Sequence, residues 1–106
     1  MVGKKKIFEF AKQMGRQFNV QKIILFGSFA SGSATEDSDV DLLVVLPFEG
    51  RRVDESVKIR LQLKPEFPVD LIIRKPEEIK ERLAMGDPFI RQIIEEGKVI
   101  YEADNN

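Results

Sequence analysis

The chain has 106 residues, 17 of them basic and 18 acidic, and its formal net charge of −1 gives no general attraction to nucleic acid or to an anionic membrane. It contains no cysteine and no histidine, which excludes disulfides, thiol nucleophiles, serine–histidine triads and imidazole or thiolate metal sites. This length predicts a single domain, residues 1–106, with little chain left to enclose a large substrate. No apolar run approaches the ~18 residues of a membrane span, so we expect a cytoplasmic protein that does not associate with membranes.

The first half of the chain predicts a helix followed by two buried strands. Between residues 2 and 18, apolar side chains three and four positions apart form the stripe of an amphipathic helix: Ile7, Phe10, Ala11, Met14 and Phe18. Two short apolar runs, Lys22–Phe26 and residues 40–46, predict buried strands, the second of which is stopped by Pro47.

The second half predicts three further helices and two further strands. Val53, Val57 and Leu61 are four apart and predict a surface helix over residues 51–63, with Arg51, Arg52, Lys58 and Arg60 on its solvent side. Residues 69–73 and 98–101 predict strands. Pro76 and Pro88 suit the first turns of two helices that end near Gly86 and Gly97. Strands that alternate with helices indicate an α/β or α+β domain.

Three aspartates stand in places where aspartate is a poor choice. Asp39 and Asp41 open one apolar strand, and Asp70 lies between Val69 and Leu71 in another. Because strand side chains alternate, Asp39 and Asp41 project from one face, about 6.6–6.8 Å apart along the chain. If the strand of Asp70 is a neighbour, three like charges meet and repel unless a cation neutralises them. With only oxygen ligands available, Mg²⁺ is the natural cation, completed by phosphate oxygens and water.

Each aspartate also has a purely structural interpretation. Ser38 and Asp39 could close a turn at the strand entrance after Glu36 and Asp37. Asp70 alone could face solvent or pair with a cation such as Arg74. The arrangement of all three is harder to explain in this way.

Gly27 and Ser28 follow the first strand and predict a phosphate-binding turn. Glycine allows the backbone to approach a ligand, and the amides at the start of the next helix point toward an anion. Phe29, which comes next, is more often a packed residue than one stacked on a base.

Gly27-Ser28, ten intervening residues and then Asp39-Val40-Asp41 resemble the signature of the DNA polymerase β-like nucleotidyltransferase superfamily. With Asp70 as the third carboxylate, the similarity covers residues 22–74, and the helix and strand over residues 88–102 are similar to the end of the shortest members, the minimal nucleotidyltransferases. The resemblance implies a mixed β-sheet flanked by helices. It also implies that Gly27 and Ser28 bind the nucleotide phosphates, that Asp39, Asp41 and Asp70 bind Mg²⁺ or Mn²⁺, and that Asp70 takes the proton of the acceptor hydroxyl.

The resemblance further implies an antitoxin that transfers AMP from ATP to a hydroxyl of a HEPN-type toxin encoded beside it, so that nucleic acid is not the direct substrate. Many minimal members carry arginines where this chain has Phe29 and Ser31. This difference favours one alternative, an antitoxin that acts by binding and occlusion. Transfer to a small molecule is a second alternative, and a ferredoxin-like or regulatory domain with coincidental aspartates is a third.

Overall fold

Helices and strands alternate along the computed structural model, which describes residues 1–104; residues 105–106 of the predicted domain lie outside the described part. The elements are α1 (Lys4–Gln17), β1 (Lys22–Phe26), α2 (Ser28–Ser31), β2 (Val40–Val45), α3 (Arg52–Leu63), β3 (Val69–Arg74), α4 (Pro76–Ala84), α5 (Pro88–Glu96) and β4 (Lys98–Glu102). The structure thus confirms the predicted helices and strands, with ends that differ by a few residues.

The four strands form one mixed sheet in the order β3-β2-β1-β4. β1 is antiparallel to both β2 and β4, whereas β2 and β3 are parallel and are joined through α3. The end of β1 therefore lies at the same edge of the sheet as the beginnings of β2 and β3. This topology brings the turn after β1 next to the first residues of β2 and β3, as the argument from the aspartates requires.

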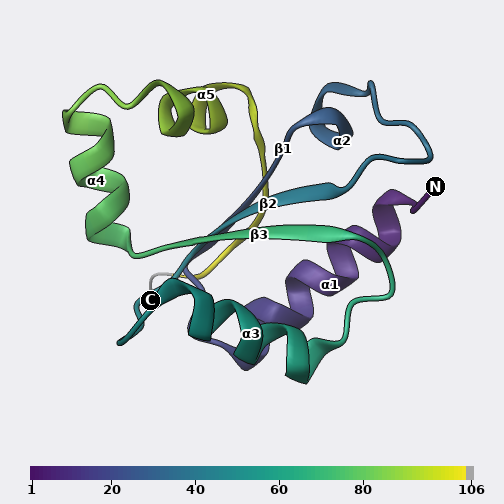
Figure 1. Ribbon diagram of the computed structural model, residues 1–106, viewed down its shortest axis with the longest axis horizontal. Helices are drawn as coiled ribbons and strands as arrows, with labels where there is room; N and C mark the ends of the chain where they lie inside the picture. The colour runs from purple at the N-terminus through teal and green to yellow at the C-terminus, as the bar shows by residue number, and fades with distance from the viewer. Residues whose placement is uncertain (105–106) are drawn as a thin grey trace.

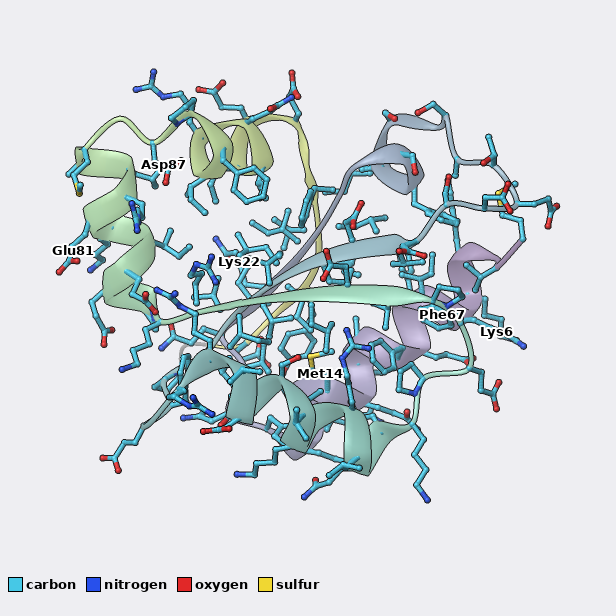
Figure 2. All side chains as sticks on the ribbon, in the orientation of Figure 1. Lys6, Met14, Lys22, Phe67, Glu81 and Asp87 are labelled. Carbon is cyan, nitrogen blue, oxygen red and sulfur yellow. The ribbon has the colours of Figure 1, made fainter. Side chains whose placement is uncertain are left out.

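Helices cover both faces of the sheet (Figure 1). α1 and α3 lie over one face, where Met14 of α1 is fully buried between helices and strands (Figure 2). α4 and α5 lie over the other face, where Ile93 of α5 packs with Ile24, Leu43 and Val45. The structure is therefore the predicted α+β domain. Within residues 1–104, no helix is long and apolar enough to cross a membrane.

The predicted packing face of α3 is wrong, although the helix itself is present. Val53, Val57 and Leu61 are exposed, and the side chain that α3 buries is Ile59. Leu63, four positions further, packs on the same core. Arg60, predicted to face solvent, is partly buried and donates a hydrogen bond to the carbonyl oxygen of Val69 at 2.7 Å. Two stripes with four-residue spacing compete in this helix, and the one that meets the sheet contains Ile59 and Leu63.

Candidate active site

Asp41 and Asp70 are direct neighbours on the parallel strands β2 and β3. The residues on either side of them, Val40 and Leu42 in β2 and Val69 and Leu71 in β3, are buried in the core beneath α1 and α3. Because side chains alternate along a strand, both carboxylates project from the opposite face, on strands about 4.8 Å apart. The condition that the strand of Asp70 neighbours that of Asp41 is therefore met.

Asp39 precedes β2 by one residue and is two positions from Asp41, so the alternation continues to the same side. It is exposed, and the turn before it closes through other groups: Ser38 Oγ accepts from the amide of Thr35 at 2.9 Å. Within residues 1–104, no hydrogen bond is recorded to the Asp39 carboxylate. The structural interpretation of this turn therefore involves Ser38 and leaves Asp39 available to a ligand.

Gly27 lies directly against the carboxylate of Asp41. Phe26, at the end of β1, is paired with Asp41 across the antiparallel ladder, and Gly27 then turns the chain with φ of 73°. A Cβ atom added at Gly27 would come within 2.3 Å of Asp41 Oδ2. Glycine is therefore required twice, for the positive φ and for the close approach of the backbone.

Ser28 begins α2 immediately after this turn. The first amide hydrogen bonds of α2 run from Ala30 and Ser31 to the carbonyl of Gly27, both at 3.1 Å. The amides of Ser28 and Phe29 precede these bonds and belong to the unsatisfied first turn of a helix. The predicted phosphate-binding residues are thus next to the predicted carboxylates.

Burial raises the pKa of Asp41 above its ordinary value, and the negative charges of Asp70 and Asp39 raise it further. The charges of both other aspartates therefore act on Asp41, and a nearby cation would act in the opposite direction, lowering the pKa of Asp41. Arg74 does not supply this charge: it lies at the far end of β3 and donates to the carbonyl of Ile73. Among residues 1–104, no salt bridge to Asp39, Asp41 or Asp70 is recorded.

The donor set suits Mg²⁺ or Mn²⁺, although no three acidic groups within residues 1–104 converge as a closed metal cluster. Mg²⁺ is commonly held by one or two carboxylates, with water and substrate phosphates as its other ligands. Asp41 with Asp70 or Asp39 could provide these carboxylate ligands, and the phosphates would lie beside Gly27 and Ser28.

Phe29 and Ser31 differ in what they contribute to this site. Phe29 is partly buried and packs on the core beneath α1, so the packed interpretation is confirmed. Ser31 Oγ lies 2.8 Å from Ser33 Oγ and donates to the carbonyl of Ser28 at 3.3 Å. Neither residue brings a positive charge to α2.

A cavity of about 320 Å³ lies between α2 and α5, and nothing in the sequence analysis predicts it. It begins at Gly27 and is lined on α5 by Phe89, Gln92 and Glu96. The nearest signal in the sequence is Phe89 itself, an aromatic residue outside the buried Ile90 and Ile93 stripe of α5.

The comparisons with known proteins agree with this geometry. Residues 4–101 match the family described as "Nucleotidyltransferase domain". The chain is 33% identical over 99 residues to MJ0604 of Methanocaldococcus jannaschii, named as a candidate protein adenylyltransferase; the match covers 92% of this chain and 96% of that protein. The chain therefore belongs to the nucleotidyltransferase family.

Further similarities concern one segment of the sequence and the fold. A segment of 33 residues, 31% of this chain and 33% of the relative, is 52% identical to the protein adenylyltransferase MntA of Thermococcus cleftensis. A candidate nucleotidyltransferase from Sulfolobus solfataricus has the same fold, with a TM-score of 0.66 at 19% identity over 96% of this chain and 82% of that one. A toxin–antitoxin structure with AMP-PNP has a TM-score of 0.57 at 20% identity, covering 97% of this chain and 76% of the other. The two solved structures share the fold of this chain, and the family match makes the chain a nucleotidyltransferase enzyme, as the signature predicts.

Proposed function

We propose that this enzyme transfers AMP from ATP to a hydroxyl group of a partner protein, with Mg²⁺ or Mn²⁺ bound by Asp39, Asp41 and Asp70. The observation that carries the proposal is the register of Asp41 with Asp70, beside a glycine whose backbone touches the Asp41 carboxylate. Relatives named as protein adenylyltransferases support transfer to a protein. The small domain offers little chain to surround an acceptor, which also favours an acceptor that docks by its own surface.

The reaction requires the acceptor oxygen to attack the α-phosphorus of ATP while the bond to pyrophosphate breaks. Ser28 and the first amides of α2 would hold the phosphates, and this fixes the direction of attack. Asp70 is exposed beside Asp41 and would receive the proton of the acceptor hydroxyl. A bound divalent cation would supply charge for the phosphates and lower the mutual repulsion of the carboxylates.

The partner that we propose is a HEPN-type toxin encoded beside this protein, with a tyrosine hydroxyl as the acceptor. The support is the fold that this chain shares with a chain of a toxin–antitoxin structure, at 20% identity. On this proposal the protein is a cytoplasmic antitoxin that silences its partner by covalent modification.

Occlusion without transfer is the second candidate, favoured by one observation. Phe29 is packed and Ser31 is uncharged, so α2 adds no cation to the phosphate site. A partner that is neutralised by contact alone would need no phosphate site.

Intact mass spectrometry of the co-expressed neighbouring protein separates the two candidates. We expect additions of whole AMP units with the parent chain, and none with Asp70→Asn. Asp37→Asn, which neutralises an exposed acid just outside the site, is the control and should still modify the neighbour. A neighbour that stays unmodified yet neutralised with the parent chain would establish occlusion and overturn transfer.

A further inference from the structure

The cavity between α2 and α5 opens directly from the predicted phosphate turn. Its walls include Phe26 and Gly27 at the end of β1, Ser31 of α2, and Phe89, Gln92 and Glu96 of α5. A volume of about 320 Å³ is at the lower end of the range for small-molecule sites, about 300–1,000 Å³. A group attached to phosphates held at Gly27 and Ser28 could therefore enter it without leaving the site.

Aromatic side chains line this cavity. Phe26 and Phe89 meet edge to face, with ring centroids 6.0 Å apart and an angle of 86° between the rings. Phe89 is 49% exposed, although Ile90 and Ile93 of the same helix are buried. An exposed phenylalanine that packs against a neighbouring ring offers an aromatic surface on which a flat heterocycle can stack.

The polar groups of α5 favour a ligand that donates hydrogen bonds. Gln92 Nε2 donates to Glu96 Oε2 at 2.9 Å, one helical turn away. Gln92 Oε1, the one oxygen of that amide, and Glu96 Oε1 can each accept a hydrogen bond from a ligand. The negative charge of Glu96 together with two apolar rings makes this cavity unsuitable for the phosphate tail itself.

We propose that this cavity binds the base of the nucleotide, an amino-bearing purine such as adenine, with Phe89 stacking on the ring and Glu96 accepting from the exocyclic amino group. The inference rests on the proposed function, because it requires the phosphates to lie at Gly27 and Ser28. It adds two residues that determine specificity, Phe89 and Glu96, to a site that is otherwise built for phosphate and metal.

Calorimetry with two ligands, Mg²⁺–ATP and Mg²⁺–tripolyphosphate, tests the stacking role. Phe89→Ala should weaken ATP binding about 5- to 150-fold, the range for loss of one base–aromatic stack, and leave tripolyphosphate affinity unchanged. The matched control is Phe8→Ala, because Phe8 is 48% exposed on α1 and does not line this cavity. It should leave both affinities unchanged.

A second pair of variants tests the contact to the amino group. The parent chain should prefer ATP to purine riboside triphosphate, which lacks the exocyclic amino group. Glu96→Ala should remove this preference, because the charge-assisted acceptor is lost. Glu95→Ala, which changes the adjacent exposed acid outside the cavity, should retain it.

The outcomes distinguish this inference from the proposed function on which it rests. If the parent chain binds neither ATP nor tripolyphosphate, the nucleotide site itself is wrong. If it binds both, but Phe89→Ala affects ATP no more than Phe8→Ala does, the site stands and the base lies elsewhere. Equal weakening of ATP and tripolyphosphate by Phe89→Ala would place the phosphate tail in this cavity and also overturn the inference.

Discussion

The acidic residues at the two ends of the β2–β3 pair differ in whether they have salt-bridge partners. At the beginning of these strands, Asp41 and Asp70 are adjacent, and the described residues place no salt-bridge partner on either. At the other end, Arg52 of α3 pairs with Glu78 of α4, and Arg82 lies 3.8 Å from Asp87 at the start of α5, labelled in Figure 2. Arginines therefore neutralise the acidic side chains at the end of β2 and β3, whereas the aspartates at the beginning of these strands have no such partner among the described residues.

The pKa values of the acids follow this division. At the first end, burial and the neighbouring carboxylates all raise the pKa of Asp41. At the other end, burial by itself would raise the pKa of Glu78, but the hydrogen bonds from Arg52 and from the Lys75 backbone, with the charges of Arg52 and Arg74, bring it below its ordinary value. Acidic groups that are paired with cations of the same chain stabilise the fold. Acidic groups without such a partner indicate a binding site for a cationic ligand.

The largest effect is expected from removing two of the unbalanced acids. Asp39→Asn with Asp41→Asn should reduce AMP transfer to background, because the metal and nucleotide lose their ligands, while the fold remains. Transfer of labelled AMP and circular dichroism measure the two properties. A control pair, Asp37→Asn with Asp54→Asn, neutralises two exposed acids elsewhere and should remain active. Equal activity of both pairs would remove the carboxylates from the mechanism.

A large effect is also expected at the glycine that touches Asp41. Gly27→Ala would force a Cβ against Asp41 Oδ2 and should abolish detectable binding of Mg²⁺–ATP in calorimetry. Gly32→Ala is a control for positive φ, because Gly32 has φ of 83° and open space around it. The strain is about 1–2 kcal/mol at Gly32, which is left-handed, and up to about 3 kcal/mol at Gly27, whose ψ of −154° lies in a region used almost only by glycine. Only Gly27→Ala should lose nucleotide. Equal losses would show that strain, and not contact with Asp41, decides the result.

A smaller effect, on stability alone, is expected at the balanced end. Glu78→Gln should lower the free energy of unfolding by about 1 kcal/mol, because Arg52 loses its ion pair at a side chain that is only 23% exposed. The folded pKa of Glu78 is depressed, so its contribution is present at neutral pH and is lost as the pH falls through that folded value. Urea unfolding at neutral and acid pH measures this, and loss of transfer by the folded variant would contradict a purely structural role.

The smallest effect has the opposite sign. The folded pKa of Asp41 is raised, so ionisation disfavours the folded state, and stability is lost as the pH rises through that value. Asp41→Asn should therefore stabilise the metal-free protein at pH 7, by less than about 1 kcal/mol after solvent screening. The gain should disappear below the ordinary pKa of 3.8. Urea unfolding in the presence of a chelator measures this difference. A variant less stable than the parent chain at pH 7 would contradict the expectation.

Local patterns predicted most of the fold and the first residues of the site. The stripe from Ile7 to Phe18 and the run Lys22–Phe26 each have one arrangement that buries their apolar groups, and both are confirmed. The sequence placed Asp70 with Asp41 only on the condition that their strands are neighbours, and the parallel pairing of β2 with β3 meets this condition. The roles of Gly27, Ser28 and the three aspartates remain predictions.

Features that depend on distant contacts could not be predicted. Spacing identified a stripe in α3 but could not tell whether Val53 or Ile59 faces the sheet. Arg60 is partly buried and donates to the carbonyl of Val69, nine residues away, a contact that spacing does not predict. Phe89 and Glu96 line a cavity only because α5 packs beside α2, which local spacing does not predict. Local spacing fixes what a helix can bury, and tertiary packing selects what it does bury.

The central claim is that the unbalanced acids at the beginning of β2 and β3 bind a divalent cation together with the nucleotide. Electron paramagnetic resonance of free Mn²⁺, titrated with the protein in the presence and absence of a non-hydrolysable ATP analogue, tests it most directly. We expect the nucleotide to increase Mn²⁺ binding by the parent chain and by Asp54→Asn, and Asp41→Asn to abolish that increase. Equal Mn²⁺ binding by Asp41→Asn and the parent chain, with nucleotide present, would contradict the account.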